Sequence, residues 1–362
     1  MKRGLVHIEI LRVIAICFVV FNHTWTSGFM LYSAVGRSYR YYYPLVFLSI
    51  LCKIAVPVFF MISGALLLGR EESCRELYGK RVVRILLALV LFSCVEYCYK
   101  LAMGAGSVRA AFRAVADGFH PVDFLRGIYS EEQAAAYWYL YAYLAFLVML
   151  PLLRKMVRMM RAEDYRYLFV LQLVIVGVLP ILEYLLWGGQ YTMHREFNIV
   201  FVTTDCVFYP LMGYALEHVL DERRYTGKNA LLLTAVGAIA IVICGILTTD
   251  RMQATGEKTE EVFHNTLIVL PTCAAYFIAK FLCGKYKLPE WIRKAAATAG
   301  STVFGIMLLE DILRKELGGI FEYLKPIVGI FPACAVWVAA VVVSGGVLTW
   351  ILKQIPGVKR LL

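Results

Sequence analysis

One apolar stretch near the start of the chain decides the fold class: VHIEILRVIAICFVVFNHTW, residues 6–25, with Glu9, Arg12 and His23 inside it. At about 100° per residue, the steps from Arg12 to His23 make about three helical turns, so both side chains point the same way, about 16 Å apart along the axis. Glu9 lies three residues before Arg12, close enough to pair with it. A charge at membrane depth costs about 2.5 kcal/mol or more and normally faces a bundle interior or a wet cavity. The stretch therefore predicts a first membrane helix that lines a polar site; interfacial placement of Glu9 and Arg12, with His23 capping the outer end, is the alternative.

Apolar stretches of similar length recur along the whole chain of 362 residues, which is 60% hydrophobic and 17% charged, with a mean hydropathy of +0.68. Each is long enough to cross a hydrocarbon core of about 30 Å. No small-residue cleavage site follows the first stretch and Arg12 interrupts it, which favours a retained helix over a signal peptide. We predict an all-α integral membrane protein, a bundle of about ten transmembrane helices forming a single domain over residues 1–362. The predicted spans lie near residues 8–27, 44–68, 82–103, 136–153, 167–187, 199–218, 229–249, 263–283, 298–313 and 327–352.

The net charge of +11 is distributed unevenly between the two sides of this bundle. With the N-terminus inside, the loops on that side carry most of the Lys and Arg residues, which is the positive-inside bias and places both termini in the cytoplasm. The basic charge then orients the protein and requires no nucleic-acid partner. The ten cysteines are scattered singly, without a C-x-x-C pair, so we predict neither a disulfide framework nor a metal site.

Aromatic and amphipathic segments are predicted on the outer side. The connection over residues 104–135 contains a pattern, from Val108 to Phe119, that is typical of a short amphipathic helix at the interface. Trp138 and Tyr139 open the fourth span among several tyrosines. Such rings form the aromatic belt of membrane proteins, and they would also suit a sugar acceptor that arrives from outside.

Further polar motifs occur in and beside the second and third spans. Lys53 is a second basic residue at membrane depth, and Pro57 frees a backbone carbonyl that must find a partner or line a cavity. Ser63 and the glycine after it let a neighbouring backbone approach closely, for which helix packing is the plain explanation. Arg81 and Arg84 lie three residues apart at a helix N-terminus, an arrangement suited to phosphate groups or to ordinary positive-inside anchoring.

In their order and spacing these motifs resemble the bacterial membrane acyltransferase-3 family over essentially the full length of the chain, and most of all the branch that includes the enterobacterial common antigen O-acetyltransferase. The matching motifs are Glu9-x-x-Arg12 with ten residues between Arg12 and His23, Lys53-Ile-Ala-Val-Pro57 through Ser63-Gly64, Arg81-Val-Val-Arg84, Trp138-Tyr139-Leu140 leading to Leu150-Pro151, Phe208-Tyr209-Pro210-Leu-Met-Gly213, and Ser301-Thr-Val-Phe-Gly305-Ile306.

The resemblance implies a multi-pass O-acyltransferase of the bacterial cytoplasmic membrane, surrounded by membrane lipids. Such an enzyme moves an acyl group, expected to be acetyl, from cytoplasmic acyl-CoA to a hydroxyl of an envelope polysaccharide or lipid-linked sugar. Acyl-CoA is a co-substrate here, and no permanently bound cofactor is expected.

The resemblance also carries expected roles. It implies catalytic roles for His23 and Arg12, and donor binding by Arg81 and Arg84, joined by Lys53 and Ser63. Glu9, Asn22, Trp138 and Tyr139 are expected on the substrate side. An imidazole, with a pKa of about 6.5, is a natural base for a sugar hydroxyl. A fixed donor such as Arg12, Lys53 or Asn22 would stabilise the oxyanion formed from the thioester carbonyl.

One position departs from the family pattern. Where relatives usually carry an aromatic residue followed by His, this chain has Met307-Leu-Leu-Glu310-Asp311. Glu310 could accept a proton itself or orient His23, and it could equally mark an altered acceptor or lost activity. Two other functions therefore stay open: a transporter or flippase for a small polar solute or lipid-linked sugar, against which the absence of an internal repeat argues, and an inactive scaffold for envelope assembly.

Overall fold

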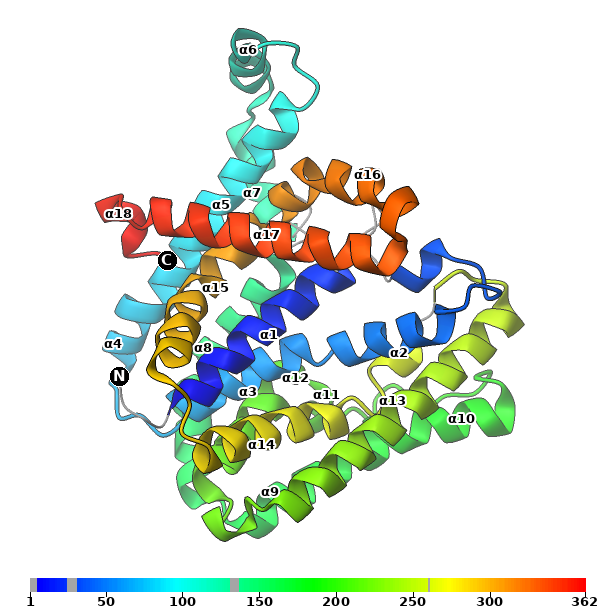
Figure 1. The fold of residues 1–362 in the computed structure, drawn as a ribbon. Coiled ribbons are helices and arrows are strands. Elements are labelled where there is room, and N and C mark those ends of the chain that lie inside the picture. Colours follow the sequence, from blue (N-terminus) through cyan, green and yellow to red (C-terminus); the bar gives the residue numbers. More distant parts are fainter. Residues whose placement is uncertain (1–4, 25–30, 131–136, 260) are drawn as a thin grey trace.

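The structure, a computed structural model, describes residues 5–24, 31–130, 137–259 and 261–362. These residues form helices and no strand, which confirms the all-α membrane fold (Figure 1). The helices are α1 (Val6–Asn22), η2 (Leu31–Ala34), α2 (Tyr42–Cys52), α3 (Ala55–Leu67), α4 (Cys74–Leu77), η3 (Tyr78–Val82), α5 (Val83–Ala102), α6 (Val108–Gly118), α7 (Pro121–Ser130), α8 (Trp138–Met159), α9 (Ala162–Gln172), η5 (Leu173–Val178), α10 (Leu179–Trp187), α11 (Val200–Thr203), α12 (Asp205–Tyr214), η6 (Ala215–Val219), η7 (Glu222–Arg224), α13 (Gly227–Thr255), η8 (Val262–His264), α14 (Val269–Lys285), α15 (Glu290–Glu316), α16 (Gly318–Val328), α17 (Ile330–Leu352) and α18 (Pro356–Lys359).

Eight helical segments of the described chain are long and apolar enough to cross a membrane, fewer than the ten spans expected from sequence. The first and sixth expected spans account for the difference. α1 has 17 described residues, and Trp25 with the remainder of the expected first span lies outside the described residues. The sixth is not one helix: Thr204, with φ −107° and ψ 111°, separates α11 from α12.

The second expected span is also interrupted, at its charged residue. α2 ends at Cys52 and α3 begins at Ala55, so Lys53 lies in the break between them. Pro57 falls in the first turn of α3. Backbone N–H groups in the first turn have no acceptor within the helix, so the lack of an N–H on proline costs no hydrogen bond there. The proline therefore favours the start of a new helix here rather than a kink within one.

At the centre of the bundle, α3 and α12 cross with their backbones in contact. A Cβ on Gly64 would lie 1.9 Å from the carbonyl oxygen of Pro210, and a Cβ on Gly213 would lie 2.0 Å from that of Met61. Only glycine can occupy either position without moving a helix. Close packing, the plain explanation of the Ser63-Gly64 motif, is therefore confirmed.

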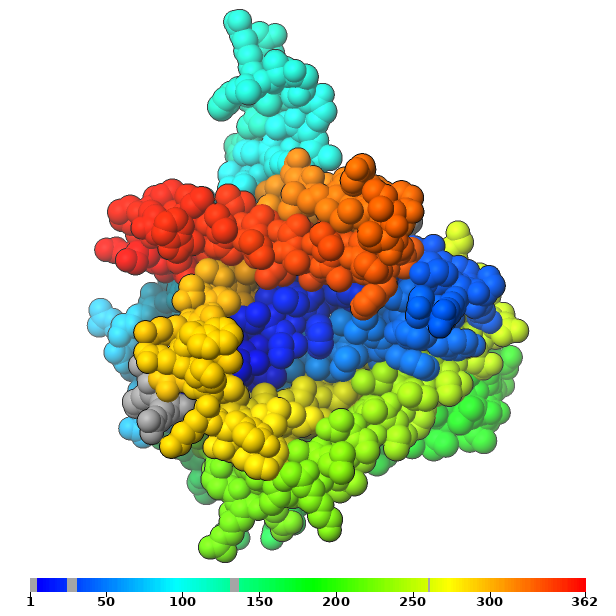
Figure 2. Space-filling view, viewed as in Figure 1, coloured from blue at the N-terminus to red at the C-terminus, as the bar shows by residue number. Residues whose placement is uncertain are grey.

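The helix that carries Arg12 and His23 packs against α3, α14, α15 and α17. In the view of Figure 2, α1 is visible on the surface between α14 and α17. Two apolar grooves flank it, with volumes of about 580 Å³ against α14 and about 530 Å³ against α15 and α17. Neither groove includes Arg12 or His23, so the polar face of α1 points away from them.

Both ends of the described chain lie on one side of the bundle, as the sequence predicts for the two termini. The start of α1 and the C-terminal helix α18 lie at the same side of the bundle (Figure 1). Their placement in the cytoplasm remains a prediction. The expected amphipathic helix is present as α6, which has no buried residue and lies at the end of α5 that projects from the bundle.

Candidate functional site

His23 and Glu310 form the centre of the candidate site at the end of α1. The imidazole Nδ1 of His23 lies 3.0 Å from a carboxylate oxygen of Glu310, which α15 supplies. The Glu310 side chain is 4% exposed, whereas that of His23 is 30% exposed. The carboxylate is thus enclosed behind an imidazole that keeps an accessible edge. Glu310, where this chain departs from the family pattern, is a direct hydrogen-bond partner of His23 and is not turned toward lipid.

Glu310 belongs to a charged network on its own helix. The Nε atom of Arg314 lies 3.8 Å from Glu310, and Arg314 also pairs with Asp311. Lys315 donates to Asp311 at 2.5 Å. Tyr137, one residue before α8, donates its hydroxyl hydrogen to the Leu308 carbonyl at 2.7 Å and so ties α8 to this part of α15. Arg314 lies four residues after Glu310, so helix spacing alone could have pointed to it, whereas Tyr137 reaches α15 only in the folded chain.

Asn22 and Lys53 lie beside α2 rather than at the inner end of the bundle. The Asn22 amide donates to the Ser49 carbonyl at 3.3 Å, while its Oδ1 atom is buried without a hydrogen-bond partner in the described chain. Lys53 follows Ser49 by one turn, and its ammonium lies 3.6 Å from the carboxylate of Glu261. Asn22 directly precedes His23, so these groups belong to the same end of α1 as the imidazole.

Arg12 and Glu9 form the pair expected from their spacing, with a distance of 2.8 Å between guanidinium and carboxylate. Glu9 also packs against α15, where a Cβ on Gly300 would lie 2.0 Å from its Oε2 atom. Gly300 therefore makes room for the carboxylate that holds Arg12. Both side chains are partly buried, with 30% of Arg12 and 15% of Glu9 exposed.

Ser63, Tyr139 and Tyr143 meet Arg12 within the bundle. Ser63 donates to the Phe59 carbonyl at 2.8 Å, and its side chain lies near the hydroxyls of both tyrosines, whose rings stack with their centroids 6.0 Å apart. Arg12 interacts electrostatically with both hydroxyls. The sequence position of Tyr143 alone would place it with the outer aromatic residues, whereas its ring contacts with Tyr139 and Phe146 show that it faces the interior.

Arg81 and Arg84 also act electrostatically on the Tyr143 hydroxyl, yet their own partners differ. Arg81 donates through Nε to the Glu72 carboxylate at 3.0 Å. Arg84 donates through Nε to the Leu361 carbonyl at 3.0 Å and lies over the Phe304 ring. Arg81 is on the π-helical turn η3 and Arg84 on α5, so the regular i,i+3 stacking of an α-helix does not hold between them.

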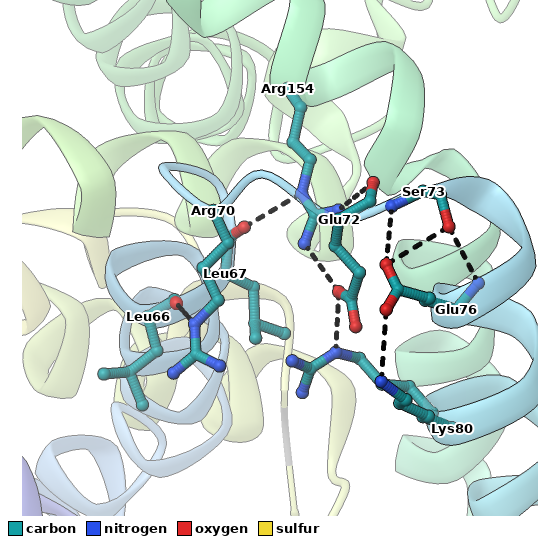
Figure 3. A network of polar contacts seen from close by, with 9 residues as sticks. Leu66, Leu67, Arg70, Glu72, Ser73, Glu76, Lys80 and Arg154 are labelled. Atoms are coloured by element: carbon teal, nitrogen blue, oxygen red, sulfur yellow. Dashed lines mark hydrogen bonds and ion pairs between the residues drawn. The ribbon is translucent and has the colours of Figure 1, made fainter.

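Glu72 is shared between two arginines. The same carboxylate oxygen accepts hydrogen bonds from Arg81 and from Arg154 of α8, both at 3.0 Å. Arg154 also donates to the carbonyls of Leu67 and Glu72, which fixes the turn after α3 (Figure 3). Partial burial acts to raise the pKa of the Glu72 carboxyl, but hydrogen bonds from Arg154 and Arg81 outweigh it and hold the pKa below its ordinary value of 4.5.

The lowered pKa of Glu72 predicts a pH-dependent contribution to stability. A depressed carboxyl pKa stabilises the fold fully above the ordinary value of 4.5, and this is lost as the pH falls through the lower folded value. Glu72→Gln should therefore reduce the Tm of the purified protein at pH 7, and the gap from wild type should narrow as the pH falls below 4.5. Glu71→Gln, at the exposed neighbouring residue, is the control and should leave Tm unchanged. An equal Tm for wild type and Glu72→Gln at pH 7 would contradict this.

Trp138 belongs neither to the residues around His23 and Glu310 nor to those around Arg12 and Ser63. It is 45% exposed at the start of α8, and its ring meets that of Tyr139 edge-on at 6.4 Å. Tyr139 is half-buried and touches Phe59 and Phe60 on α3. Of the two predicted aromatic contacts for substrate, the structure places only Tyr139 beside Ser63 and Arg12.

Comparison with known proteins agrees with this arrangement. The acyltransferase-3 family, described as an acyltransferase domain, matches residues 5–351. No curated protein and no solved structure matches the chain, so the branch related to the enterobacterial common antigen enzyme stays a prediction. The match includes every predicted site residue, from Glu9 to Glu310. The chain therefore belongs to the acyltransferase-3 family of multi-pass membrane acyltransferases.

Proposed function

We propose that this protein is an O-acyltransferase of the bacterial cytoplasmic membrane that moves an acetyl group from cytoplasmic acetyl-CoA to a hydroxyl of an envelope polysaccharide or lipid-linked sugar. The observation that carries the proposal is the hydrogen bond between His23 and the enclosed Glu310 carboxylate of α15. His23 directly follows α1, the helix that carries Arg12. The family match supports acyl transfer and gives no support to the transporter alternative.

The geometry at His23 suits general-base catalysis. With Glu310 as a carboxylate, the hydrogen bond requires that Nδ1 carry the hydrogen, which leaves the lone pair on Nε2 to accept a proton. In the proposed reaction the acceptor hydroxyl oxygen bonds to the thioester carbonyl carbon while its proton moves to Nε2. The C–S bond then breaks, and the departing thiolate takes that proton from the imidazolium.

We propose that Arg12 supports the donor rather than the reacting carbonyl at His23. The two residues are separated by about 16 Å of helix axis, which exceeds the reach of one arginine side chain. Arg12 instead acts on Tyr139 and Tyr143, the latter also influenced by Arg81 and Arg84. These five residues, which we call the inner group, are assigned to the acyl-CoA donor. Oxyanion stabilisation near His23 is assigned to Asn22 or Lys53.

Transfer from a labelled donor tests the proposal. The purified full chain in lipid nanodiscs would be incubated with [14C]acetyl-CoA and a bacterial envelope glycan fraction, and both free CoA and labelled glycan would be measured. Formation of alkali-labile labelled glycan with stoichiometric CoA release is the expected result, because an O-acetyl ester is cleaved by base. Uptake of labelled solute into proteoliposomes without CoA release would instead identify a transporter.

Glu310 is expected to act on the reaction through His23. Glu310→Gln keeps the size of the side chain but not its charge, so the imidazole loses its fixed tautomer and kcat should fall on the order of 10²-fold. Glu310→His, which restores the usual family residue, should keep part of the activity. Glu322→Gln on α16, at an exposed glutamate paired with Lys325, is the control and should keep wild-type kcat. Full activity of Glu310→Gln, measured as CoA release, would remove Glu310 from the mechanism.

A further inference from the structure

Two cations from helices far apart in sequence meet beside the inner group. Lys353 directly follows α17, and its ammonium donates to the Ser301 carbonyl of α15 at 2.5 Å. The Arg84 guanidinium lies over the ring of Phe304, which follows Ser301 by one turn on α15, so both cations reach the same part of that helix. Burial first, and then the Arg84 charge, lower the pKa of Lys353. Ser301 is one residue from Gly300, against which Glu9 packs, so Lys353 reaches the same part of α15 as the Arg12 pair.

These two cations differ from Arg81 in having no acidic partner. Among the described residues, neither Arg84 nor Lys353 has a carboxylate within the 4.0 Å of an ion pair, whereas Arg81 is 3.0 Å from Glu72. Both hydrogen-bond backbone carbonyls, which supply no net charge. Arg84 is exposed and Lys353 partly buried, and the two like charges repel each other, so an anion bound between them would be stabilised by both.

The remaining donors are arranged for a group with several oxygens. An ammonium has three N–H donors and a guanidinium five, so one carbonyl contact each leaves donors on both side chains for a ligand. The Leu361 carbonyl and the Phe304 ring hold the Arg84 guanidinium in place. A phosphate, with its multiple charge and its several acceptor oxygens, matches such a pair better than a carboxylate does.

We propose that Arg84 and Lys353 together bind one phosphate group of the acyl-CoA donor, with Lys353 supplied by the end of the last membrane helix. The proposal rests on the proposed acyltransferase function and refines it. Arg81 is then a positioning residue, held by Glu72, and the donor's phosphate is bound between α5 and α17. A phospholipid headgroup offers the same phosphate chemistry, and the experiment separates the two sources.

The affinity for CoA is the first measurement, made by calorimetry on the purified full chain in phosphatidylcholine nanodiscs. Lys353→Met should weaken CoA binding about tenfold, the scale of one charge-assisted hydrogen bond, and Lys353→Arg should restore most of it. Lys359→Met, at an exposed lysine on α18, is the matched control and should bind as wild type. Arg84→Met combined with Lys353→Met should lose less than the product of the single losses, because both cations serve one phosphate.

Kinetics with two donors provide the second measurement. Lys353→Met should raise KM for acetyl-CoA about tenfold at nearly constant kcat, and it should leave KM unchanged for S-acetylpantetheine, which has no phosphate. An equal penalty with both donors would overturn the proposal, as would wild-type CoA affinity in Lys353→Met. An effect that appears only in phosphatidylglycerol nanodiscs would assign the cations to a lipid headgroup and also overturn it. If the wild-type chain neither bound CoA nor released it from acetyl-CoA, the acyltransferase proposal itself would fail.

Discussion

His23→Ala is expected to reduce acyl transfer by about 10³-fold or more while the protein still inserts and folds. The expectation follows from the loss of the only imidazole held by Glu310 in the described chain, since general-base catalysis contributes about 10²–10⁴-fold. CoA release from acetyl-CoA in the presence of acceptor glycan, measured on variants purified to the same monodispersity, gives the comparison. CoA affinity should stay near wild type, because the donor phosphates are assigned to the other end of α1.

His120→Ala, at an exposed histidine between α6 and α7, is the matched control and should retain wild-type turnover. A His23→Ala protein that kept near-normal kcat would make Glu310 the leading candidate base. A loss of CoA affinity equal to the loss of kcat would show instead that the substitution disturbs the bundle. The separation of kcat from CoA binding therefore distinguishes a catalytic from a structural role.

Gly64→Ala is expected to have the largest effect on the fold. The added methyl group would lie 1.9 Å from the Pro210 carbonyl oxygen, and its nearest contacts are backbone atoms that cannot rotate away. α3 and α12 would have to separate along their whole contact, at a cost of about 3 kcal/mol or more. The purified yield and the Tm in detergent should both fall sharply relative to wild type.

Gly284→Ala provides the control for this prediction. Gly284 is also a helical glycine, on α14, but a Cβ there meets no atom within 4 Å. Alanine favours a helix over glycine by about 1 kcal/mol, so this variant should be as stable as wild type or more so. A Gly64→Ala protein with unchanged Tm would show that the crossing is looser than the close contact with Pro210 implies.

Sequence patterns predicted the features that depend on helix periodicity. Glu9 and Arg12 lie on one stripe because of their spacing, and the structure joins them at 2.8 Å. The same stripe continues to His23, whose partner Glu310 was recognised as a candidate from one departure in a family motif. The Glu9–Arg12 pair could be predicted because a regular α-helix converts sequence spacing directly into direction. The contact between His23 and Glu310 joins two helices and depends on how they pack.

The predictions that failed or were missed depend on irregular backbone or on tertiary contacts. Arg81 and Arg84 have the spacing that would stack them on an α-helix, but Arg81 lies on a π-helical turn and the two arginines have different partners. Thr204 interrupts the expected sixth span between α11 and α12, although the span as a whole is apolar. Tyr143 and Lys353 reach their neighbours only through the packing of separate helices, which no local pattern encodes.

The break between α2 and α3 has a consequence for how the protein is made. Lys53 enters the membrane with the second span, whereas its partner Glu261 follows far later in the chain. At about 5–20 residues per second, translation reaches Glu261 about 10 s or more after Lys53. A lysine at the centre of an inserting helix costs about 2.5–3.5 kcal/mol, so the apolar residues around it must carry the segment into the bilayer before Glu261 exists. The ion pair can therefore form only late in biogenesis, when the expected span near residues 263–283 brings Glu261 to a lysine that is already in the membrane.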